Sequence, residues 1–144
     1  MSSSPGISAL AAIRGRLPVN IVCAIAALIA AWIISAAALS INQLLFHGSG
    51  IGPGPLIGIV SLGLQAAMIA LVARGHAVGR GLALLFFVLA ALPLPMVERL
   101  VAERAIFSAA YLVSGFVLKG AATVLLFTGD SRRWFAARDS LVIR

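Results

Sequence analysis

Four long runs of apolar residues, separated by short polar or glycine- and proline-rich segments, dominate the chain. The runs cover residues 20–46, 55–73, 79–96 and 105–128. A helix that crosses a bilayer needs roughly 20 mostly apolar residues, so each run is long enough for one crossing. The pattern predicts an all-α fold, an integral membrane four-helix bundle.

The two ends of the chain are more polar than the runs. Residues 1–19 form a basic leader, and residues 129–144 form an amphipathic tail. In the tail, Arg132 and Arg133 precede Trp134 and Phe135, a combination that is typical of membrane–water interfaces. We therefore expect a short interfacial C-terminal helix anchored by these four residues.

The leader and first run also fit a secretory signal peptide. The start is basic, the stretch 21–34 is apolar and the small residues Ala36–Ala38 resemble a cleavage site. The apolar run continues to residue 46, which favours a spanning helix. Cleavage of residues 1–38 stays open as the alternative.

Prolines interrupt the end of the third run. Pro93 and Pro95 lack the backbone N–H that a helix needs, so we expect a bend or an end there. The segment that follows alternates apolar and charged residues and is expected to lie at the membrane surface. Its candidate contacts for a partner protein are Glu98, Arg99, Glu103 and Arg104.

Charged residues predict the sidedness of the chain. Cytoplasmic loops of membrane proteins carry an excess of Lys and Arg. The outer side would hold only Arg99 and Arg104. The other side would hold eight arginines: Arg14, Arg16, Arg74, Arg80, Arg132, Arg133, Arg138 and Arg144. Both termini are therefore expected to be cytoplasmic.

Composition supports the membrane assignment. Hydrophobic residues make up 62% of the chain and charged residues 10%, whereas about 25% charge is usual in soluble domains. The net charge of +7 is explained by residues that flank the apolar runs, so we expect contact with the lipid bilayer and not with nucleic acid. The single cysteine, Cys23, forms no internal disulfide and no metal site.

Small residues recur at helical spacing in three of the runs, and the third run lacks such a stripe. Small residues let helix backbones approach closely in lipid. The stripes predict packing within the chain, with docking on a partner as the alternative. They comprise Ala24, Ala27, Ala31, Ser35, Ala38 and Asn42; Gly54, Gly58, Ser61 and Gln65; and Ser108, Tyr111, Gly115, Lys119 and Ala122.

Lys119 is the one charge far from the ends of a run, because Arg80 is the second residue of the third run. An ionisable group at that depth is costly and marks a functional site. Lys119 and Gln65 lie about 15 Å and about 13–14 Å from the cytoplasmic ends of their helices. We therefore expect the Gln65 carbonyl to accept a hydrogen bond from Lys119, with Ser61, Ser35 or Tyr111 nearby. Snorkelling of the ammonium to the cytoplasmic interface is the simpler alternative, and a partner-facing or transport role of Lys119 is the third.

Catalytic chemistry is not indicated. The chain has no acid inside a run, no metal-binding motif and no phosphate-binding loop, so we expect no catalytic, cofactor or metal site and no enzyme activity. The four-helix multidrug exporters need an acid in the first span, and residues 20–46 contain none.

The stretch Leu125 to Phe135 resembles the end of small, uncharacterised four-helix inner-membrane proteins of bacteria. The resemblance covers about a dozen residues, and it implies a bacterial inner membrane and four spans, without an activity. Two functions stay open. The first is binding of another protein, as a small complex subunit or an immunity-type protein. The second is a small oligomeric transporter or channel that uses Lys119 and Gln65.

Overall fold

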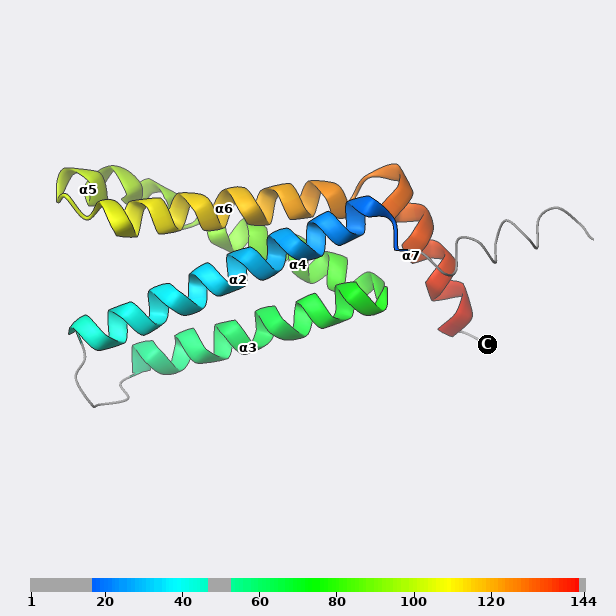
Figure 1. Ribbon diagram of the computed structural model, residues 1–144, viewed down its shortest axis with the longest axis horizontal. Helices are drawn as coiled ribbons and strands as arrows, with labels where there is room; N and C mark the ends of the chain where they lie inside the picture. Colours follow the sequence, from blue (N-terminus) through cyan, green and yellow to red (C-terminus); the bar gives the residue numbers. More distant parts are fainter. Residues whose placement is uncertain (1–16, 47–52, 143–144) are drawn as a thin grey trace, which may run out of the picture.

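The computed structural model describes residues 17–46 and 53–142, with side chains over 17–41 and 56–137, and this part of the chain is helical without strands. The expected leader up to residue 16 and residues 47–52, between the first two runs, lie outside the described residues. Long helices lie side by side, and a short C-terminal helix crosses one end (Figure 1). In chain order the elements are α2 (Val19–Phe46), α3 (Pro53–Arg74), α4 (Ala77–Ala91), η1 (Leu94–Met96), α5 (Val97–Ala102), α6 (Ile106–Leu126) and α7 (Gly129–Val142).

Four segments are long and apolar enough to cross a membrane, which confirms the number of apolar helices that the sequence predicts. They are Val19–Ile41, Leu56–Arg74, Ala77–Ala102 and Ile106–Leu126. Much of their surface remains exposed, including large side chains such as Ile57 and Val124. Contiguous apolar exposure of this extent suits lipid and not water.

The third segment is broken where the prolines stand. Helix α4 ends at Ala91, five residues before the expected end at residue 96. Because Pro93 has no N–H, the carbonyl of Leu89 accepts its hydrogen bond from Leu92 instead, at 3.3 Å. The chain then turns through η1 into α5. Helix α4 has 15 residues and is about 22 Å long, shorter than a hydrocarbon core of about 30 Å.

Each of the four long helices packs extensively on two others. Helix α2 packs on α3 and α6, and α4 also packs on α3 and α6. The α2–α6 interface is the most extensive, and in Figure 1 these two helices converge toward the end of the molecule where α7 lies. Buried side chains gather nearer the end that α7 covers: Ile21, Ala24, Leu28, Met68, Val72, Ala83, Ala122, Leu126, Trp134 and Phe135.

The small-residue stripes lie between the helices of this chain. Ala24, Ala31 and Ser35 of α2 and Gly115 and Ala122 of α6 are all buried. The small side chains on these faces allow α2 and α6 to pack closely, whereas at Gly115 a Cβ would have no neighbour within 4 Å. The structure thus favours packing within the chain over docking of these faces on a partner. The side chain of Asn42 and the surroundings of Gly54 lie outside the part of the chain that the structure describes.

Helix α4 has a small-residue contact that the sequence pattern did not reveal. Gly75, in the left-handed region with φ 81°, ends α3, and its N–H donates to the Val72 carbonyl at 3.0 Å. The tight turn brings α4 back against α3 at Gly79 and Ala83, both buried. A Cβ at Gly79 would lie 2.7 Å from the Val72 backbone nitrogen, so this position requires glycine.

We expect Gly79→Ala to destabilise the protein by about 1–3 kcal/mol, because the added methyl pushes on backbone that cannot move aside as a side chain would. Gly81→Ala is the matched control in the same helix, since a Cβ there has nothing within 4 Å. The control should be neutral or slightly stabilising. The unfolding midpoints of the two variants in detergent measure the difference in stability. Equal midpoints would contradict the close α3–α4 contact.

Candidate functional site

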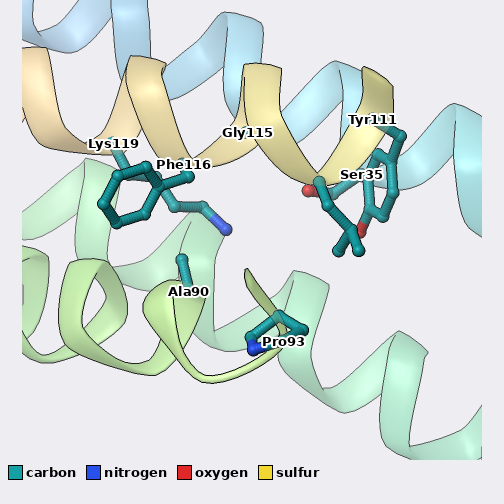
Figure 2. A pocket seen from close by; sticks show the side chains of 8 residues that line it. Ser35, Ala90, Pro93, Tyr111, Gly115, Phe116 and Lys119 are labelled. Carbon is teal, nitrogen blue, oxygen red and sulfur yellow. The ribbon is translucent and has the colours of Figure 1, made fainter. Parts of the chain in front are cut away.

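Lys119 lies on the α6 face that turns toward α2 and α4, next to the buried Gly115. The lysine is half-buried and lines a cleft between these three helices, with Ser35 from α2 and Pro93 from the end of α4 on the other walls. In Figure 2 the amine points into the space between α6 and the end of α4. The full lining is Ser35, Ala90, Pro93, Tyr111, Leu112, Gly115, Phe116 and Lys119.

Two features of the sequence make this cleft. Glycine at 115 leaves a hollow on α6, and a Cβ there would have no neighbour within 4 Å. The proline break ends α4 at this level, so no further helical turn fills the space. One wall is fixed by Phe116, whose ring stacks on Phe87 at 5.0 Å between centroids. The cleft has a volume of about 100 Å³, enough for several water molecules.

The ammonium of Lys119 points away from the end of α6 where snorkelling would take it. Its stem runs along the helix toward Gly115 and Tyr111, which precede it in the chain (Figure 2). Side chains on helices lean toward the N-terminus, which explains the direction. The ammonium therefore lies near the middle of α6, a helix of about 31 Å. The structure does not support snorkelling toward the α7 end.

The polar groups of the cleft are two hydroxyls and the ammonium. The Ser35 hydroxyl donates to the Ala31 carbonyl at 2.8 Å, which leaves its oxygen as an acceptor. The Tyr111 hydroxyl also faces the cleft (Figure 2). Within the described part of the chain, no hydrogen bond or ion pair reaches the Lys119 ammonium. The site is thus a cation at mid-helix without a countercharge from its own surroundings.

Gln65 and Ser61 are not part of this cleft, so the predicted Lys119–Gln65 pair is wrong. Gln65 is buried on α3, and its Nε2 donates to the Ser61 hydroxyl at 3.3 Å, one turn earlier. The equal depth of Gln65 and Lys119 was the reason to pair them. Depth alone did not fix which helices are neighbours, and α3 packs on α2 and α4 rather than on α6.

The predicted partner-contact residues lie together at the end of the molecule opposite α7 (Figure 1). Glu98, Arg99, Glu103 and Arg104 are all exposed. Phe107, at the start of α6, is 94% exposed and Ile106 is 66% exposed. We call these six residues the α5 surface.

Arg104 has a strained backbone within the α5 surface. Its φ is 58°, in the left-handed region, where the chain turns from α5 into α6. A backbone hydrogen bond holds the turn: the N–H of Ala105 donates to the Leu100 carbonyl at 2.8 Å. Glycine is the usual residue in this position, and a side chain there costs about 1–2 kcal/mol.

Of the four residues predicted to form an interfacial anchor, two are exposed and two are buried. Arg132 and Arg133 of α7 are exposed, but Trp134 and Phe135 are 4% and 1% exposed. Both rings pack into the core, Trp134 edge-on to Phe135 at 5.0 Å. The correction has a simple cause, because an aromatic residue beside arginine suits a protein interface as well as a membrane surface.

Arg80 takes part in the docking of α7, a role that the sequence did not reveal. Its guanidinium lies over the rings of Phe127 and Phe135, 4.6 Å and 5.2 Å from their centroids. Such cation–π contacts are worth about 0.5–2 kcal/mol. A hydroxyl network adds to the docking of α7, in which Ser131 donates to the Leu125 carbonyl at 2.8 Å. The aromatic residues lie far from Arg80 in sequence, so no spacing pattern indicates the contact.

No group of three or more metal-ligating side chains occurs among the residues that the structure describes. The Lys119 cleft offers donors for an anionic group, and the α5 surface offers exposed charges beside apolar side chains. Comparison of the chain with protein-family models, curated proteins and solved structures gave no match.

Proposed function

We propose that this chain is a multi-pass protein of the bacterial inner membrane that acts by binding another protein, as a small complex subunit or an immunity-type protein. Its four apolar helices form a bundle in the bilayer, and both termini are cytoplasmic. The distribution of arginines supports this orientation. The α5 surface then lies on the outer side.

The observation that carries the proposal is Arg104. A charged, exposed residue stands where glycine would relieve backbone strain, and strained residues cluster at binding sites. Its neighbours are three exposed charges and the nearly fully exposed Phe107. Arginine and aromatic residues are enriched at protein interfaces. The α5 surface therefore has the composition of a contact site for a protein.

Replacement of Arg104 separates stability from binding. Arg104→Gly is expected to raise the free energy of unfolding by about 1 kcal/mol, because glycine adopts the left-handed backbone without strain. The same change should lower partner binding at least fivefold. Binding is measured as the yield of adducts from a photo-crosslinking residue placed at position 107 of the full chain in native membranes.

Arg132→Ala is the matched control, an exposed arginine at the opposite end of the molecule. It should leave the adduct yield unchanged. Adducts only with lipid or only with further copies of this chain, or equal yields from both variants, would overturn the proposal.

The alternative function, an oligomeric transporter or channel using Lys119 and Gln65, gains no support from the geometry. Gln65 bonds Ser61 on its own helix and lies apart from the cleft. A homo-oligomer in native mass measurements would be its first requirement.

A further inference from the structure

Lys119 is the only lysine of the chain and the only charged residue in α2, α3, α4 or α6 apart from the arginines at their ends. Its ammonium lies near mid-helix in a cleft shared with Ser35 and Tyr111. An ammonium at this depth is retained when it has a partner. None of the described residues supplies one.

The volume of the cleft limits what the partner can be. Sites for drug-sized ligands have roughly 300–1,000 Å³, whereas this cleft has about 100 Å³. A carboxylate with its first methylene groups fits this space. Lipid phosphates lie at the membrane surface, about 15 Å from the middle of a hydrocarbon core of about 30 Å, so headgroups do not reach the ammonium.

A second copy of this chain does not carry the missing acid. Its four acidic residues are Glu98, Glu103, Asp130 and Asp139. All four lie outside α2, α3, α4 and α6, in α5, in the turn after it or in α7. The acid must therefore come from a different molecule that has a carboxylate at mid-membrane depth.

We propose that the Lys119 cleft binds the side-chain carboxylate of an aspartate or glutamate in a transmembrane helix of another protein. The Lys119 ammonium and the Tyr111 hydroxyl donate to its oxygens. Ser35 has already used its hydrogen on the Ala31 carbonyl. This inference rests on the proposed function, because it names the chemistry of the protein partner.

A synthetic transmembrane helix is the probe. A leucine- and alanine-rich peptide of about 21 residues, long enough to span, carries one central glutamate; its matched control carries glutamine. Each peptide is reconstituted with the full chain in phosphatidylcholine vesicles. Association is measured by energy transfer from a dye on Cys23, the single cysteine, which is exposed. We expect the glutamate peptide to bind at least tenfold more tightly.

Two variants of the chain test the site by different means. Lys119→Met removes the charge and keeps a flexible stem, and Gly115→Val fills the cleft while residue 119 remains a lysine. Each should abolish the preference for glutamate. Thermal unfolding in detergent identifies a variant that fails to fold, and the other variant then decides.

A hydrophobic carbodiimide locates the contact. It activates the glutamate carboxylate, and attack by the Lys119 amine releases the urea and leaves an amide. Because Lys119 is the only lysine, one crosslinked peptide is expected. Equal binding of the two peptides, a preference that survives in both variants, or full competition by millimolar acetate would overturn the inference.

The two proposals fail separately. If the peptides bind equally while crosslinking at position 107 still captures a protein in an Arg104-dependent way, the cleft inference is wrong and the proposed function stands. If the glutamate peptide is preferred but position 107 yields no protein adduct, the binding role of the α5 surface is wrong.

Discussion

Replacing Phe135 with alanine is expected to release α7 from the rest of the protein. Phe135 is among the largest fully buried side chains and is 1% exposed. Its ring touches the Arg80 guanidinium and Trp134, so its loss leaves a cavity and removes two ring contacts. Phe→Ala changes in cores cost about 3–5 kcal/mol, which shifts the docking equilibrium of α7 by about 140- to 3,700-fold.

Limited trypsin digestion measures this release, because Arg132 and Arg133 are exposed on α7 itself. Cleavage after them should become much faster in Phe135→Ala. Phe107→Ala is the matched control, the same change at a residue that is 94% exposed. It should change stability by less than about 0.5 kcal/mol. Equal cleavage rates in the two variants would show that α7 does not dock through Phe135.

The second large effect is expected at the α2–α6 interface. Ala122 of α6 is fully buried, as is Ala24 of α2. Ala122→Leu inserts three carbon atoms at a fully buried position of the core, and overpacking of this kind costs about 1–3 kcal/mol or more. In lipid no hydrophobic gain offsets this cost, because lipid tails are as apolar as leucine.

The neighbouring alanine provides the control. Ala121 is exposed, so Ala121→Leu adds the same atoms to the outer surface of the same helix. Unfolding of the two variants in mixed micelles should differ by at least about 1 kcal/mol. If Ala121→Leu is the more damaging of the two, the assignment of the inner face of α6 is wrong.

The helices themselves were predictable from the sequence because their signal is local. Long apolar runs, the prolines at 93 and 95 and the small residues at helical spacing each act within one or two turns. The stripe in α4 was missed because it has only Gly79 and Ala83, and its meaning depends on the left-handed Gly75 that brings α3 close.

The site was predictable only in part, since it depends on which helices are neighbours. Lys119 was identified because a charge in an apolar run is locally anomalous. Its predicted partner Gln65 was wrong because equal depth on two helices does not make them adjacent. Tyr111 and Ser35 share the cleft with Lys119, but Pro93 and Gly115 shape it, and their roles follow from the packing of α4 on α6.

The contact of Arg80 with Phe127 and Phe135 also sets an order for assembly during synthesis. Phe135 lies 55 residues after Arg80 in the chain. At about 5–20 residues per second, the ribosome needs about 3–11 s to cover that distance. In the proposed orientation, Arg80 is during this interval a hydrated charge that helps hold the start of α4 on the cytoplasmic side. Only afterwards does the same guanidinium lie over the two aromatic rings, so in that orientation one arginine first marks the membrane side of α4 and then helps to dock α7.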